Sequence, residues 1–218
     1  MEAALALSWA CLVFTIWMFS TGLSDLRRMV TLKNIDNIQF LPYVTTAVNN
    51  LGWFYYGELK GDWTLMTVNS IGFTLQSCYI VTYLYFSSEK CRLLVRVGLA
   101  ALALACAYLY LSTVVQEPDV RLSQLGLVCC TFTIGMYLSP LTDLVKIIHT
   151  RSTKCLSFSL TVATFLTSSS WTLYGLHLSD FYIVIPNVPG IVTSLIRFWL
   201  FWTYPASPDR YPYRPMQA

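Results

Sequence analysis

The chain has 218 residues, of which 56% are hydrophobic and only 11% charged, and its mean hydropathy is +0.55. Soluble domains carry about 25% charged residues, so the composition excludes an ordinary soluble domain and favours a membrane protein. The net charge of +3 follows from where the basic residues lie along the chain and does not indicate nucleic-acid binding.

Seven apolar segments are each long enough to cross a bilayer, which requires about 20 residues per helix. We expect them at 4–23, 38–57, 63–86, 95–115, 123–142, 156–176 and 181–203. The first segment has no basic start and no A-x-A cleavage site, so we interpret it as a retained membrane helix and not as a secretory signal.

The basic residues of the loops predict the orientation of these segments. Eleven Lys and Arg residues fall in the connections after segments one, three and five and in the tail, whereas the opposite loops hold only Lys60 and Arg121. Because Lys and Arg collect on the cytoplasmic side of membrane proteins, we predict an extracellular or lumenal N-terminus and a cytoplasmic tail.

The sequence contains an internal repeat. Six residues recur in the same order and with the same spacing: Trp53, Tyr56, Gly57, Asp62, Asn69 and Gly72 in the first copy, and Trp171, Tyr174, Gly175, Asp180, Asn187 and Gly190 in the second. The two members of every pair are 118 positions apart, which indicates an ancient duplication.

The position of the repeat within the seven segments predicts the architecture. Segments one and five match each other and are separated by an even number of crossings, so both copies insert in the same direction. We expect an all-α membrane protein with two parallel three-helix bundles joined by a linker helix, a 3+1+3 plan. The expected units are residues 1–92, 93–121, 122–204 and a cytoplasmic tail, 205–218. Transporters built from such repeats bind substrate between the repeats, near the middle of the bilayer.

Trp53, Asn69, Trp171 and Asn187 are the candidate binding residues. An amide in hydrocarbon needs hydrogen-bond partners, and the alternative role for each Asn is to bridge two helices. The alternative role for each Trp is in the interfacial aromatic belt. Two indoles and two amides at repeat-related positions favour a shared cavity, in which ring faces cover a sugar ring and amides bind its hydroxyls.

Charged residues are absent from the middle of segments one to six. Ion-coupled carriers keep intramembrane carboxylates, so we expect passive transport of an uncharged substrate. Arg197 lies toward the cytoplasmic end of segment seven, where it can extend to the membrane surface. The cysteines and the two histidines form no metal-ligand spacing, and we expect neither a metal nor another cofactor.

From about Ala10 to Pro205 the chain resembles the SWEET family of sugar transporters, and most closely its animal members. The residues that carry the resemblance are the repeat motifs above together with Phe40-Leu41-Pro42, Met136-Tyr137-Leu138-Ser139-Pro140-Leu141 and Ile185-Pro186-Asn187. SWEET proteins are themselves an example of parallel repeats. The resemblance implies facilitative transport of small sugars such as glucose by alternating access, with no enzymatic activity. It also implies the plasma membrane or the Golgi as the location, and it allows a homo-oligomer.

The resemblance assigns further roles to single residues. It implies a sugar held between Trp53 and Trp171 and hydrogen-bonded by Asn69 and Asn187, in a pocket that Asn49 and Thr167 shape. It implies an outer gate at Tyr56, Lys60 and Asp180, although Lys60 could equally be a solvated loop charge. The hinge positions that match the family are Pro42, Pro140, Gly22 and Ser159, of which the last two are not proline here.

Three alternatives remain at this stage. A seven-helix receptor needs no internal duplication. A PQ-loop carrier or retrieval receptor for another small ligand shares the architecture, but this chain has no Pro-Gln dipeptide at the ends of its repeats. A scaffolding role is the third alternative.

Overall fold

The computed structural model describes residues 2–36, 38–137, 141, 144–145, 147–149, 153 and 156–204. Within these residues every regular element is a helix. The elements are α1 (Glu2–Ser20), α2 (Leu23–Leu32), α3 (Leu41–Lys60), α4 (Trp63–Phe86), α5 (Lys90–Leu109), the π-helix η1 (Tyr110–Val114), α6 (Pro118–Met136), α8 (Phe158–His177) and α9 (Phe181–Thr203).

A helix is present in each of the seven predicted segments. The bounds of α4 and α9 agree with the predicted segments 63–86 and 181–203. The first segment differs, because α1 ends at Ser20 and a short turn at Thr21–Gly22 leads into α2, which the sequence did not predict. The predicted linker helix begins earlier than expected, at Lys90.

Length and hydropathy alone identify three spans among the described residues that are able to cross a membrane: Glu2–Leu32, Lys90–Val114 and Phe181–Thr203. The helices α3 and α8 are long enough, but several Thr, Ser and Asn side chains lower their hydropathy. A membrane crossing by all seven helices therefore stays a prediction.

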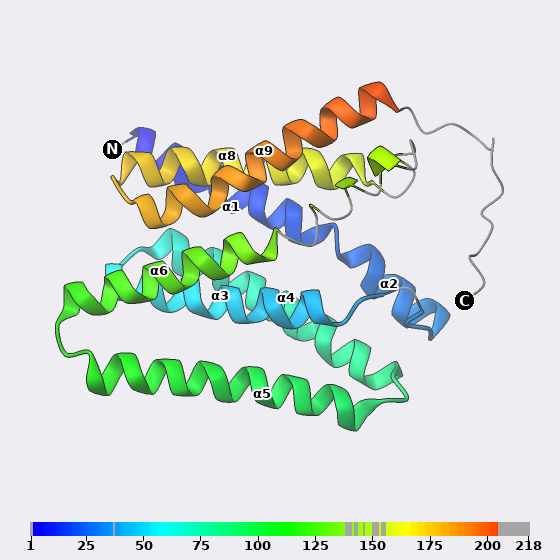
Figure 1. The fold of residues 1–218 in the computed structure, drawn as a ribbon, viewed down its shortest axis with the longest axis horizontal. Helices are drawn as coiled ribbons and strands as arrows, with labels where there is room; N and C mark the ends of the chain where they lie inside the picture. Colours follow the sequence, from blue (N-terminus) through cyan, green and yellow to red (C-terminus); the bar gives the residue numbers. More distant parts are fainter. Residues whose placement is uncertain are drawn as a thin grey trace.

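The two halves of the chain pack in the same way. In the first half α4 packs against both α1 and α3, and in the second half α9 packs against both α6 and α8. Two further contacts join the halves, α1 with α8 and α3 with α6. Figure 1 shows these contacts between the halves, with the blue α1 beside α8 and the green α6 beside α3. The helix α5 lies at the edge of the molecule and packs against α3 and α4.

The same short turn precedes α4 and α9. Gly61 and Ser179 adopt positive φ angles of 68° and 55°, and the next residue in each turn is an aspartate. Asp62 accepts hydrogen bonds from the backbone N–H groups of Thr64 and Leu65, and Asp180 accepts one from Tyr182. Each aspartate therefore caps the N-terminus of its helix, where the helix dipole stabilises a negative charge.

Two glycines allow the helices on either side of these turns to approach closely. A Cβ atom on Gly57 would lie 2.8 Å from the Leu65 Cβ, and one on Gly175 would lie 2.9 Å from the Val184 Cγ2. Real Cβ atoms need more space, so the Trp-x-x-Tyr-Gly motif ends in the one residue type that permits this packing. The tyrosine and tryptophan of each motif are thereby fixed close to the following helix.

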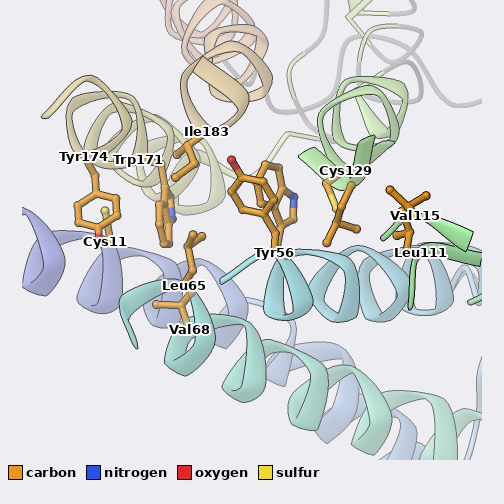
Figure 2. Close-up of a cluster of buried hydrophobic side chains, with 12 residues drawn as sticks. Cys11, Tyr56, Leu65, Val68, Leu111, Val115, Cys129, Trp171, Tyr174 and Ile183 are labelled. Atoms are coloured by element: carbon orange, nitrogen blue, oxygen red, sulfur yellow. The ribbon is translucent and has the colours of Figure 1, made fainter. Parts of the chain in front are cut away.

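A buried cluster joins the two halves just below these turns. It includes Cys11, Tyr56, Leu65, Trp171 and Ile183, all less than 8% exposed. In Figure 2, Leu65 and Ile183 lie between the rings of Tyr56 and Trp171, which come from different halves. The aromatic residues of both repeats are therefore part of one core and do not form two separate belts.

Candidate functional site

A cavity of about 340 Å³ lies between the two halves. All six residues that the sequence proposed for the binding site line it: Asn49, Trp53, Asn69, Thr167, Trp171 and Asn187. Sites for small molecules have volumes of about 300–1,000 Å³, so the cavity is large enough for a small ligand.

Each tryptophan of the cavity is held by a threonine from the other half. The Trp53 Nε1 atom donates to the Thr133 Oγ1 atom at 3.0 Å, and the Trp171 Nε1 atom donates to the Thr15 Oγ1 atom at 2.9 Å. Thr15 and Thr133 are themselves 118 positions apart. Because the single indole N–H is used in this bond, each tryptophan offers its ring face to the cavity.

The two repeat-related asparagines have the same geometry. The Nδ2 atoms of Asn69 and Asn187 donate to the backbone oxygens of Leu65 and Ile183, four residues earlier, at 2.8 and 2.7 Å. Among the described residues these amides do not bridge two helices, and neither Oδ1 atom accepts a hydrogen bond. The carboxamide oxygens are therefore available to accept hydrogen bonds from hydroxyl groups.

Asn49 and Thr167 occupy equivalent positions but differ in their hydrogen bonding. The Asn49 Oδ1 atom accepts a hydrogen bond from the Thr133 hydroxyl at 2.8 Å, so it supports the threonine that holds Trp53. The Thr167 hydroxyl is buried and has no hydrogen-bond partner among the described residues. The two halves of the cavity wall are thus chemically different.

Polar contacts join the two halves beside the turns that precede α4 and α9. The Tyr56 hydroxyl donates to the Asp180 Oδ2 atom at 2.8 Å, and the Lys60 ammonium forms an ion pair with the same oxygen. The Tyr174 hydroxyl lies 2.9 Å from both carboxylate oxygens of Asp62. The structure therefore brings the proposed gate residues together and adds a second, repeat-related contact that the sequence analysis missed.

The proposed hinge residues lie at helix ends. Gly22 is in the turn between α1 and α2, and Pro42 and Ser159 are each the second residue of a helix, α3 and α8. The spacing of 118 pairs Pro42 with Leu160, one position beyond Ser159. Pro140 lies outside the described residues. Proline is tolerated in the first turn because the N–H it lacks is not used by the helix.

Several lining residues were not anticipated from the sequence, among them Arg197 and Asn50. Arg197 lines the cavity, whereas we expected its side chain to extend to the membrane surface. Asn50 also lines the cavity and is 3% exposed. The sequence feature that could have placed Arg197 at the cavity is its position within an apolar segment. No sequence signal separates Asn50 from the neighbouring Asn49.

Comparisons with known proteins identify the family. The family model described as "Sugar efflux transporter for intercellular exchange" matches twice, at residues 5–91 and 123–209. The chain is 59% identical to "Sugar transporter SWEET1" of Xenopus laevis over 97% of each chain. It is 56% identical to "Sugar transporter SWEET1" of Homo sapiens over 92% of this chain and 91% of the human protein.

A solved structure has the same fold. The chain matches the structure titled "The 3.7 A resolution structure of a eukaryotic SWEET transporter" with a TM-score of 0.87 and 27% identity. The match covers 93% of this chain and 97% of that chain. The duplicated motifs, the helical fold and both matches of the family model lead to one conclusion: the chain belongs to the SWEET family of sugar transporters.

Proposed function

We propose that the chain is a facilitative transporter of small neutral sugars such as glucose, and that the cavity between its halves is the sugar site. The observation that carries this proposal is the convergence of Trp53, Trp171, Asn69 and Asn187 on one cavity. In this proposal all seven helices span the membrane in the 3+1+3 plan, with the N-terminus outside and the tail in the cytoplasm. Family membership sets aside the receptor and scaffold alternatives.

The chemistry of the cavity suits a sugar. The faces of two indoles, held in place by Thr15 and Thr133, cover the C–H faces of a pyranose ring. The carboxamide oxygens of Asn69 and Asn187 accept hydrogen bonds from its hydroxyls. Pro186 lies beside Asn187 inside α9 and lacks a backbone N–H, so it leaves an acceptor without its usual helical partner.

The cavity also supports transport without ion coupling. No Asp or Glu among the described residues lines it, and Arg197 is the one charged residue on its wall. A proton-coupled carrier needs a carboxylate that binds and releases protons within the membrane. In alternating access the contacts of Asp62 and Asp180 with the opposite half separate when the outer end opens, and the sugar then exchanges with the outside.

The test is uptake of radiolabelled glucose into liposomes that contain only this protein. A transporter that releases its substrate binds with about millimolar affinity, near −4 kcal/mol. Loss of one hydrogen bond removes about 0.5–1.5 kcal/mol, so Asn69→Ala and Asn187→Ala are expected to reduce uptake strongly, as are Trp53→Ala and Trp171→Ala. If the purified wild-type protein moves no glucose or other small sugar, the proposal is wrong.

Surface abundance in cells separates binding from folding. A residue that binds sugar leaves the amount of protein at the surface nearly unchanged when it is replaced. A residue that holds helices together reduces that amount, and the surviving molecules transport normally. Normal uptake per surface molecule in both Asn variants would contradict the assignment of the sugar site.

A further inference from the structure

We infer that Asn50 is a further amide of the sugar site and that it donates a hydrogen bond to one particular sugar oxygen. The role of Asn50 rests on the proposed function of the cavity and adds to it a determinant of which sugar, and which orientation, is accepted. Asn50 lies on α3 next to Asn49 and lines the cavity. Its counterpart in the second half is Ser168, 118 positions later.

The hydrogen-bonding state of Asn50 points to a ligand. The residue is 3% exposed, and its Nδ2 atom has no hydrogen-bond partner among the described residues. An unpaired buried donor is unfavourable, and native structures rarely retain one without a functional reason. A ligand in the cavity that accepts a hydrogen bond from the Asn50 amide would therefore remove this unfavourable state.

The space around the amide is made by Gly72. A Cβ atom on Gly72 would lie 2.6 Å from the Asn50 Nδ2 atom and 2.6 Å from the Phe19 Cε2 atom, so no larger residue fits there. A half-turn about the soft χ2 torsion exchanges the positions of the amide nitrogen and oxygen. The oxygen then lies against Gly72, and the N–H groups face the cavity.

The position equivalent to Asn50 in the second half carries a hydroxyl in place of an amide. Ser168 occupies the corresponding place beside Gly190, where a Cβ atom would lie 2.2 Å from the Ser168 Oγ atom and 2.6 Å from the Tyr137 hydroxyl. The Ser168 and Tyr137 hydroxyls thus both lie beside Gly190. The serine has a polar neighbour within the protein, whereas the Asn50 Nδ2 atom has no hydrogen-bond partner among the described residues.

These differences predict which hydrogen bonds a bound sugar makes and in which orientation it binds. Asn69 and Asn187 present oxygens, which accept from sugar hydroxyls, and both halves supply them equally. Asn50 supplies an amide donor at a position where the second half has Ser168. The repeat symmetry alone would permit two orientations of a bound sugar. A sugar with an oxygen that accepts a hydrogen bond from Asn50 binds in one of them.

The experiment compares full-length wild-type protein, Asn50→Ala and Asn50→Ser in liposomes. Uptake of radiolabelled glucose is competed with unlabelled glucose and with each monodeoxy analogue of glucose. In the wild type, the analogue that lacks the oxygen bound by Asn50 is expected to compete roughly three- to tenfold less well than glucose. Both variants are expected to bind glucose more weakly by a similar factor and to stop distinguishing that one analogue.

Gln76→Leu is the matched control. Gln76 is also buried, and its Oε1 atom likewise has no partner among the described residues, but it does not line the cavity. This variant is expected to keep the wild-type order of competition among the analogues. A general disturbance of the helices would instead change all analogues alike in both kinds of variant.

The outcomes separate the two proposals. If the wild type transports glucose and both Asn50 variants keep its ratios for every analogue, the role of Asn50 is wrong and the proposed function stands. If both variants unfold, Asn50 is a packing residue and the inference is also wrong. If the wild type transports no sugar, the proposed function itself fails.

Discussion

The two proposed gate contacts are repeat-related but unequal, and removing their tyrosine hydroxyls tests this difference. At Asp62 the only partner from the other half, among the described residues, is Tyr174. At Asp180 two partners share one oxygen, Tyr56 and Lys60. Tyr174→Phe is therefore expected to open the outer end more than Tyr56→Phe does.

The magnitude follows from the groups involved. A hydrogen bond to a charged group contributes about 1.5–3 kcal/mol, so Tyr174→Phe is expected to raise the open population about 10- to 150-fold. After Tyr56→Phe the carboxylate of Asp180 keeps its ammonium partner. The expected loss is then closer to that of an ordinary hydrogen bond, about 0.5–1.5 kcal/mol, or about 2- to 12-fold.

Native Cys11 can report the opening. It is fully buried in the cluster between the halves, and Figure 2 shows it beside Tyr174. In a protein whose other six cysteines are replaced by alanine, the labelling rate of Cys11 by a membrane-impermeant thiol reagent, added from outside, follows the open population. Such labelling tracks the population when opening and closing are fast relative to the chemical reaction.

Tyr182→Phe is the matched control, because Tyr182 packs against Tyr56 with ring centroids 6.3 Å apart. No hydrogen bond joins its hydroxyl to either aspartate among the described residues. This variant is expected to label like the wild type. The reasoning is refuted if Tyr56→Phe labels as fast as Tyr174→Phe, or if neither labels faster than the wild type.

Four further predictions concern the site, a helix start and the membrane. Thr15→Val and Thr133→Val leave an indole N–H unpaired, which costs about 1–3 kcal/mol, so uptake per surface molecule is expected to fall about 5- to 150-fold and to recover when serine restores the hydroxyl; normal uptake in the valine variants would show that these bonds do not orient the indoles. Ser159→Pro is expected to be tolerated, because α3 already has Pro42 at its second position, and a large loss of thermal stability would contradict this. Glucose flux is expected to run in either direction down its gradient and to ignore an imposed pH step; proton-driven accumulation would overturn passive transport. An epitope fused after the last residue is expected to be stained only after permeabilisation, and staining of intact cells would reverse the orientation.

The sequence was sufficient to predict a helix in each of the seven apolar segments and six of the residues that line the cavity. Periodic apolar runs predict helices, and the spacing of 118 places Trp53 with Trp171 and Asn69 with Asn187 at equivalent points of two equivalent bundles. Residues at equivalent points meet at the interface when the bundles face each other. The structure indeed places all four around one cavity.

The remaining details depend on packing that one sequence does not reveal. The bonds between the tryptophans and Thr15 and Thr133 depend on how one bundle is rotated against the other. Asn49 and Asn50 are neighbours of the same type, and only their surroundings show that one supports Thr133 while the other has an unpaired donor. The break after Ser20 was missed because the predicted first segment, 4–23, runs through Thr21 and Gly22, which need not end a helix.

Because α5 connects the two repeats covalently, the two aspartate contacts of the proposed gate can become different from each other. In a dimer of two identical chains, every substitution appears twice, related by the two-fold axis. A lysine at the position of Lys60 would then face both aspartates. In this chain the position that corresponds to Lys60 is Leu178. Among the described residues Asp180 therefore has a cationic partner and Asp62 does not. Because the two repeats are fused in one chain, a single substitution can change the strength of the contacts at one aspartate and leave the contacts at the other unchanged.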